Sequence, residues 1–169
     1  MHRLVLVRHA KSSYPDGVVD HDRPLAARGS HEASLAGSWL KEHVHRVDKV
    51  IVSSAVRTQR TYELIAAEFN AVARVETDSR IYDADLATLL AVVREVPAAM
   101  ATTMIVGHAL GLPLLAYYLV EPDQAGLRDA LMQKFPTSAI AVIEAPMPWH
   151  DWTQGCGRLT AFHVPRQEP

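Results

Sequence analysis

The sequence lacks the features that mark secreted, membrane-spanning or nucleic-acid-binding proteins. Among its 169 residues there is one cysteine, Cys156, which excludes an internal disulfide and fits a reducing compartment. No apolar run approaches the roughly 18 residues that a membrane span needs. Met1 leads directly into an apolar segment, with no basic-then-apolar signal peptide. A net charge of -2 gives no reason to expect nucleic acid or an anionic membrane as a partner. We therefore expect a cytoplasmic protein.

The remaining composition is that of an ordinary globular protein. Hydrophobic residues make up 49% of the chain and charged residues 21%. The length suffices for one domain with a sizeable core, and there are no repeats, low-complexity tracts or linkers. We therefore predict a single domain over residues 1–169.

Apolar runs alternate with segments of helical spacing along the chain. Residues 3–7 are apolar without alternation, which is typical of a strand buried on both faces of a parallel sheet. Further strands are predicted at residues 50–52, 73–75 (weakly), 103–106, 139–143 and 159–163, with loops at 11–23 and 146–157. Helices are predicted after the N-caps Ser30, Ser54 and Asp85, around 112–119, and within 121–134 behind Asp123. This alternation predicts an α/β three-layer sandwich with a mostly parallel central sheet and helices on both faces.

Cationic and titratable side chains follow three of the predicted strands. Arg8 and His9 end the first strand, Arg57 lies in the first helical turn after the second, and His108 ends the fourth. Ligands in open α/β sheets bind beyond the carboxyl ends of the strands, so these side chains are expected around one point. Like charges destabilise one another, and a bound polyanion compensates for that; arginine forks match phosphate oxygens. The pattern predicts a phosphate site.

Each of these residues also has an ordinary structural interpretation. Arg57 alone is most often solvated, His108 alone is more often a helix-start histidine, and a strand-terminal Arg-His pair can simply face solvent. A metal site is the rival for two histidines, but no carboxylate or thiolate accompanies them at ligand spacing, and arginine repels a cation. We therefore predict no metal. Five further histidines are interpreted as surface or packing residues: His31, His43, His45, His150 and His163.

Several motifs, in order, resemble the histidine phosphatase superfamily, and within it the small phosphohistidine phosphatases of the SixA type. Arg8-His9-Ala10 matches the signature Arg-His-Gly/Ala, residues 53–61 resemble the second motif Ser-Ser-x-x-Arg-x-x-x-Thr, and Val106-Gly107-His108 resembles the third. Asp22-Arg23-Pro24-Leu25 with Arg28-Gly29, and Phe135-Pro136-Thr137-Ser138-Ala139, are similar to motifs of the small subfamily. The resemblance runs from residue 3 to about residue 144.

The resemblance implies phosphoryl transfer through a covalent phosphohistidine. His9 would be the nucleophile, while Arg8, Arg57 and His108 would hold the three equatorial oxygens of the phosphoryl group. Two guanidiniums and an imidazolium would neutralise the charge, so the resemblance implies neither a metal nor a cofactor. Water would then hydrolyse the intermediate.

Two residues each have two possible roles. Asp83 stands where larger members of the superfamily carry a proton-donating glutamate, but it could equally open the turn before the helix that Asp85 caps. Arg23 could be an additional phosphate or substrate contact, or its motif could serve only the turn that Pro24 fixes.

The length of the chain bears on the substrate class. It leaves no room for the long insertions that cap the pocket in larger relatives, so an open, shallow mouth is expected. That favours a phosphorylated protein, with phosphohistidine on a signalling or phosphotransfer domain as the leading candidate. A small phosphate ester is the alternative within enzymes, and a mutase is disfavoured because it needs an enclosed site. The rival outside enzymes is a non-catalytic module that binds phosphate or phosphohistidine.

Overall fold

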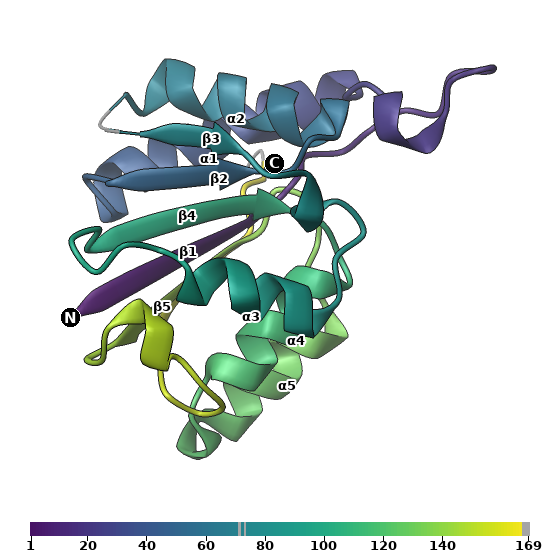
Figure 1. Ribbon diagram of the computed structural model, residues 1–169. Coiled ribbons are helices and arrows are strands. Elements are labelled where there is room, and N and C mark those ends of the chain that lie inside the picture. Colours follow the sequence, from purple (N-terminus) through teal and green to yellow (C-terminus); the bar gives the residue numbers. More distant parts are fainter. Residues whose placement is uncertain (71, 73, 167–169) are drawn as a thin grey trace.

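A six-stranded mixed sheet forms the centre of the computed structural model, which describes residues 1–70, 72 and 74–166 (Figure 1). The strand order is β3-β2-β4-β1-β5-β6; the first four of these are parallel, and β5 and β6 each run antiparallel to the neighbour before them. The strands are β1 (His2–Arg8), β2 (Lys49–Val52), β3 (Val75–Thr77), β4 (Thr102–Gly107), β5 (Ile140–Ala145) and β6 (Arg158–His163). The sheet is thus mostly parallel, as predicted.

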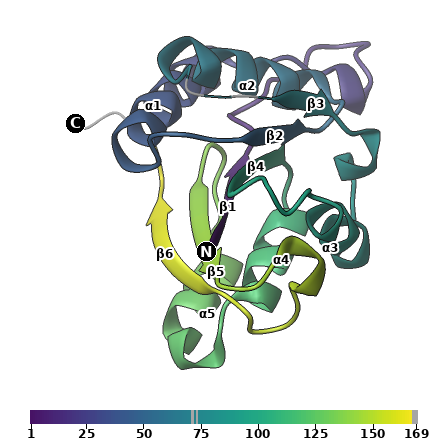
Figure 2. The ribbon, with the colours of Figure 1, turned by 60° about the vertical axis from the view of Figure 1, so that its left-hand side comes forward.

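Helices cover both faces of this sheet, which confirms the three-layer sandwich. They are α1 (Ala27–His43), α2 (Val56–Glu68), α3 (Leu86–Arg94), α4 (Gly111–Leu119) and α5 (Ala125–Gln133). Helices α1 and α2 pack on one face, and α3, α4 and α5 on the other (Figures 1 and 2). No helix among the described residues combines the length and apolarity needed to cross a membrane.

Strand β1 lies inside the sheet and explains the unbroken apolar run at its position in the sequence. Leu4 and Leu6 face the α3–α5 layer, whereas Val5 and Val7 face the α1–α2 layer. All four side chains are fully buried. Because both faces are covered, apolar residues are required at every position rather than at alternate ones. The prediction of a doubly buried first strand is therefore confirmed.

The predicted helix starts are right in one case and wrong in three. The Asp85 carboxylate accepts a hydrogen bond from the Thr88 N–H at 2.9 Å and caps α3, as predicted. Ser30 lies inside α1, which begins one turn earlier because the Ala26 N–H is already anchored by a hydrogen bond to a loop carbonyl. Ser54 does not cap α2, because its hydroxyl pairs with a ring nitrogen of His21 at 3.0 Å. Asp123 lies in a 3₁₀ turn before α5 and pairs with Arg158 instead.

Short 3₁₀ helices occupy segments that the sequence presents as loops. One spans Asp20–Asp22 and another Trp149–Asp151. Trp149 and Trp152 are fully buried there, with ring centroids 4.7 Å apart. The sequence predicts the weak third strand at 73–75, whereas β3 covers Val75–Thr77; Ala73 lies outside the described residues.

The five histidines assigned to the surface or to packing have those roles. His31, His45 and His150 are exposed. His43 and His163 both stack on the Trp39 indole, with ring centroids 4.3 Å and 4.9 Å from it. These imidazoles serve packing or solvation, away from the residues described next.

Candidate active site

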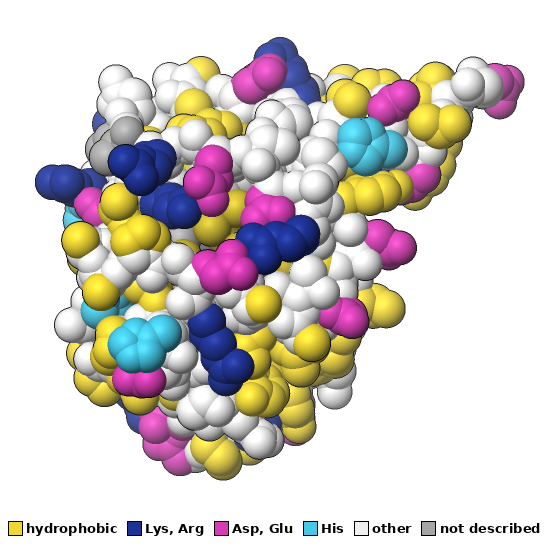
Figure 3. All heavy atoms as spheres, in the orientation of Figure 1, with side chains coloured by type: hydrophobic (Ala, Val, Ile, Leu, Met, Phe, Trp, Pro, Cys, Tyr) yellow, Lys and Arg dark blue, Asp and Glu magenta, His cyan; other side chains and the backbone are white. Residues whose placement is uncertain are grey.

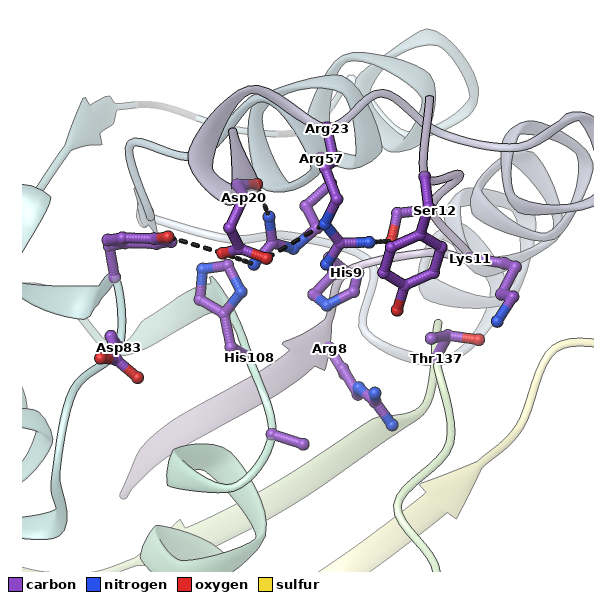
Figure 4. A pocket seen from close by; sticks show the side chains of 13 residues that line it. Arg8, His9, Lys11, Ser12, Asp20, Arg23, Arg57, Asp83, His108 and Thr137 are labelled. Carbon is purple, nitrogen blue, oxygen red and sulfur yellow. Dashed lines mark hydrogen bonds and ion pairs between the residues drawn. The ribbon is translucent and has the colours of Figure 1, made fainter. Parts of the chain in front are cut away.

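The carboxyl ends of β1, β4 and β2 lie next to one another and bring the predicted residues together. Arg8 pairs in register with Gly107, and Val52 with Val106. The His9 N–H continues the ladder with a 2.9 Å hydrogen bond to the Gly107 carbonyl. Beyond these ends lies a pocket of about 310 Å³ (Figure 4). All six predicted site residues line it: Arg8, His9, Arg23, Arg57, Asp83 and His108.

His9 lies at the floor of the pocket with one ring nitrogen oriented by the backbone. The residue is 7% exposed, and Nδ1 lies 2.8 Å from the carbonyl oxygen of Ala10. A carbonyl can only accept, so Nδ1 carries the proton and Nε2 keeps a free lone pair. The Ala10 peptide is itself held, because its N–H donates to Thr61 Oγ1 at 2.9 Å. Thr61 is the last residue of the second motif, and this hydrogen bond gives it a structural role.

Burial keeps the two histidines of the pocket uncharged. Burial, and then the proximity of His108 and Arg57, lowers the pKa of His9 to about 3. Burial, and then Arg57, lowers the pKa of His108 to about 4. Without a bound anion His108 is therefore uncharged at neutral pH; the imidazolium that the resemblance implies concerns the site with a phosphoryl group bound and stays a prediction. Its Nε2 lies 2.7 Å from the hydroxyl oxygen of Ser53, and the two histidine rings are 5.3 Å apart.

The segment before β5 fixes Arg8 in place. Arg8 donates from Nη1 to the Phe135 carbonyl at 2.8 Å. The Ser138 N–H lies 3.2 Å and 3.1 Å from the carbonyls of Arg8 and His9, with Ser138 in the left-handed region at φ 66°. The motif at residues 135–139 thus holds both the Arg8 guanidinium and the backbone of His9.

Two guanidinium N–H groups are buried without a partner. Among the described residues, neither Arg8 Nε nor Arg57 Nε has a hydrogen-bond acceptor. An unpaired buried donor costs on the order of 1–3 kcal/mol, and more for a charged group, so such donors need an explanation. Both arginines line the pocket, so an anion bound there would lie against their guanidinium groups, although neither Nε has exposed surface through which the anion could reach it directly.

Asp20 is the site residue that the sequence did not reveal. The loop after β1 brings its carboxylate into the pocket, where Oδ2 accepts from Arg57 Nη2 at 3.1 Å and from the Tyr82 hydroxyl at 2.6 Å. Oδ1 accepts from Arg23 Nε at 3.0 Å, and the Asp20 carbonyl accepts from Arg57 Nη1 at 2.7 Å. The Tyr82 hydroxyl and the two guanidiniums hold the pKa of Asp20 well below its usual range. The sequence indicates only one of these contacts: Asp20 and Arg23 are three residues apart, a spacing at which their side chains can pair.

Arg23 is held on the wall of the pocket by the same loop. Its side chain is 12% exposed and donates to the Ser12 hydroxyl at 2.7 Å. The loop in turn contacts α1, because the Ala26 N–H donates to the Lys11 carbonyl at 2.8 Å. A Cβ at position 29 would overlap that carbonyl oxygen, which explains why the Arg28-Gly29 motif has glycine there.

Asp83 lies at the edge of the pocket. It is exposed, has a left-handed backbone at φ 55°, and belongs to the turn between Ile81 and the cap residue Asp85. Its carboxylate makes no hydrogen bond with another described residue. Both interpretations of Asp83 remain consistent with this position.

The loop that carries Asp20 shapes the mouth of the pocket. It follows β1 and projects beyond the sheet at the end where β1 and β4 exit (Figure 1). In Figure 3 this arm stands out from the body of the molecule and overhangs the adjoining surface. No group of three or more His, Cys, Asp or Glu side chains within residues 1–70, 72 and 74–166 could hold a metal ion. The residues present are instead suited to an anion and a nucleophilic imidazole.

Comparisons with known proteins agree with this arrangement. The sequence model of the histidine phosphatase superfamily, branch 1, matches residues 4–104. An uncharacterised protein of Mycobacterium tuberculosis strain H37Rv is 41% identical over 162 residues, which cover 95% of this chain and 100% of that protein. The phosphohistidine phosphatase SixA of Escherichia coli K12 is 28% identical over 148 residues, or 83% of this chain and 84% of that one. A structure assigned as phosphohistidine phosphatase SixA from Nakamurella multipartitia superposes with a TM-score of 0.86 at 32% identity, covering 97% and 96% of the two chains.

Proposed function

The chain belongs to the histidine phosphatase superfamily, and from that membership we propose that it is a phosphatase acting through a covalent phosphohistidine at His9. The observation that carries this proposal is the state of the His9 ring. Its Nδ1 is committed to the Ala10 carbonyl, its Nε2 is free, and the ring is neutral above a pKa of about 3. A nucleophile must keep its lone pair at working pH, and this one does.

The reaction takes place in two steps. In the first, His9 Nε2 forms a bond to phosphorus while the bond from phosphorus to the leaving group breaks. In the second, water attacks the phosphorus and the electron pair returns to Nε2. Such transfers pass through a loose transition state, so positioning and charge stabilisation supply most of the catalysis.

Arg8, Arg57 and His108 form the proposed clamp for the phosphoryl oxygens. Both arginines line the pocket, so their guanidinium groups would meet a phosphoryl group bound there. For His108, we infer that the Ser53 hydroxyl donates to Nε2, which leaves the ring proton on Nδ1 as a third donor. Arg23 lies in the same pocket as a further substrate contact. Such preorganised donors act without reorganisation at the moment of reaction.

The proton-donor role of Asp83 stays a prediction. A carboxyl group that donates a proton at neutral pH has to be buried or paired with another carboxylate. Asp83 is exposed at the edge of the pocket. The position of Asp83 is sufficient for a role in the turn. A role as proton donor is tested by the kinetics of Asp83→Asn.

For the substrate we propose a phosphorylated protein, with phosphohistidine as the phosphorylated residue. The similarity to proteins named as phosphohistidine phosphatases supports this class. The alternative is a small phosphate ester. We also propose that the enzyme is a single domain, needs no metal and works in the cytoplasm, where its one half-buried cysteine, Cys156, would stay reduced.

The experiment that tests this proposal is a turnover assay in the presence of a chelator. A panel of phosphohistidine, phosphoserine and phosphotyrosine peptides is compared with p-nitrophenyl phosphate. We expect turnover that survives the chelator and is fastest on the phosphohistidine peptide. Binding of these ligands without turnover of any would instead identify a non-catalytic module, and a preference for small esters would identify a phosphomonoesterase.

A further inference from the structure

The Asp20 carboxylate is a negative charge at the mouth of a pocket whose other charged groups suit a negatively charged ligand. It accepts hydrogen bonds from Arg57, Arg23 and Tyr82, and its charge raises the pKa of the neighbouring His108. The low pKa of Asp20 keeps it ionised at neutral pH. A permanent carboxylate opposes phosphate binding, so its presence calls for an explanation beyond the clamp.

The position of Asp20 relative to His9 defines which part of a substrate it would meet. His9 is buried at the base of the pocket, whereas the Asp20 side chain is 58% exposed and therefore lies on the solvent side. Figure 4 shows both side chains among the residues that line the pocket. In phosphoryl transfer the attacking and leaving atoms lie roughly in line on opposite sides of phosphorus. With the nucleophile at the floor, the leaving group points to the mouth, where Asp20 lies.

The Asp20 carboxylate can still accept one more hydrogen bond. Its two oxygens offer about four lone-pair positions. Three are used, by Arg57 Nη2 and the Tyr82 hydroxyl on Oδ2 and by Arg23 Nε on Oδ1. The remaining position on Oδ1 is available to a donor that enters from the mouth.

We propose that Asp20 selects for a leaving group that carries a positive charge, the protonated imidazole of phosphohistidine, and against the oxygen leaving group of a phosphate ester. The inference rests on the proposed function, because it assigns a specificity residue to that same reaction. The protonated ring nitrogen of the substrate would donate to Asp20 Oδ1, a hydrogen bond with charge on both partners.

The chemistry of the two leaving groups makes this selection effective. When the substrate imidazole is protonated on its second nitrogen, breaking the P–N bond gives its electron pair to the ring, which leaves as neutral imidazole. The proton stays on the leaving ring, and Asp20 accepts a hydrogen bond without taking it. In an ester the pair goes to oxygen, whose developing negative charge would face the Asp20 carboxylate and be repelled.

A purely structural role for Asp20 makes a different prediction. By holding Arg57 and Arg23, Asp20 also orients the clamp. Loss of that orientation would slow every substrate by the same factor, because the phosphoryl group is common to all of them. The ratio of rates on two leaving groups therefore separates selection from positioning.

The test compares phosphoimidazole with p-nitrophenyl phosphate in the Asp20→Asn variant. Both probes are small, so recognition of a protein substrate does not enter. The control is Asp22→Asn, which removes the same charge two residues away on an exposed side chain outside the pocket lining. Circular dichroism and thermal melting check that both variants fold.

We expect Asp20→Asn to lower the ratio of kcat/KM for phosphoimidazole over p-nitrophenyl phosphate by about 10- to 100-fold, the effect of one hydrogen bond between charged groups. Asp22→Asn should leave the ratio within about twofold of wild type, as is usual for a surface substitution away from such contacts. Equal losses on both probes would overturn the inference and leave Asp20 as a positioning residue. Equal gains would overturn it too, and would show that Asp20 only competes with phosphate. Failure of the wild type to turn over either probe or any of the phosphopeptides would instead refute the proposed phosphatase function.

Discussion

Acidification should destabilise this protein well above the pH at which carboxylates protonate, because His9 and His108 are held uncharged. Their pKa values in the folded state are about 3 and about 4. In the unfolded chain a histidine has a pKa of about 6.5. Between these values the unfolded state binds more protons than the folded state, so the free energy of unfolding falls as pH falls.

The size of the effect follows from the unfolded pKa alone, as long as the folded ring stays neutral. A pH of 5 is about 1.5 units below the pKa of a histidine in the unfolded chain. Protonation therefore stabilises the unfolded state by about 2 kcal/mol per ring, because each pH unit contributes about 1.36 kcal/mol. The two rings together should therefore cost about 4 kcal/mol of stability between pH 7 and pH 5. That is a large share of the roughly 5–15 kcal/mol that a domain usually has.

Urea unfolding at pH 7 and pH 5 measures this difference directly. The His108→Asn variant should lose about 2 kcal/mol less than wild type over the same interval, since one of the two rings is gone. His31→Asn is the matched control, because His31 is exposed on α1. The reasoning is refuted when wild type loses less than about 1 kcal/mol, or when His108→Asn loses as much as wild type.

Three further predictions concern single residues around the pocket. Arg57→Ala should lower kcat by about 100- to 1000-fold, the usual loss for one preorganised donor; wild-type kinetics would remove Arg57 from the site. Asp83→Asn should slow esters and phosphohistidine alike and by less than about tenfold, because an exposed carboxyl is poorly placed to hold a proton; a loss of about 100-fold or more confined to esters would assign proton donation to Asp83. Gly29→Ala should cost about 1–3 kcal/mol in urea unfolding, because its Cβ meets the Lys11 backbone; an unchanged midpoint would contradict that contact.

The convergence of the strand ends could be predicted because it depends on local patterns. An apolar run such as residues 3–7 identifies a doubly buried strand, and parallel strands must end at the same edge of their sheet. Arg8, His9, Arg57 and His108 are adjacent in the sequence to such ends, so their proximity follows once the strands are known to be parallel. No detail of side-chain packing was needed for that step.

The role of Asp20 could not be predicted because its contacts join distant parts of the chain. Its partner Arg57 is 37 residues away and Tyr82 is 62 residues away. Its loop contains other acidic residues, such as Asp16 and Asp22, that the sequence does not distinguish from it. The lowered pKa of His108 in the free protein could not be predicted for a related reason, since burial is a property of the packed pocket and not of a motif.

The same distinction explains the errors at the helix ends. Asp85 was identified correctly because its capping bond is local, three residues long. Ser30 and Ser54 have the residue type of a cap, but the helix starts are set elsewhere: by the contact of Ala26 with the loop after β1, and by the pairing of Ser54 with His21. Residue type alone does not report such tertiary contacts.

The covalent step at His9 is tested most directly by trapping the intermediate. Protein mixed with a phosphorus-labelled substrate and quenched in alkali should carry phosphate that is stable in base, is released in acid and maps to His9. The His9→Ala variant should fold, since His9 follows β1 and lines the pocket outside the apolar core, and should carry no label and show no turnover. Robust turnover by His9→Ala, or label on any other residue, would contradict the account.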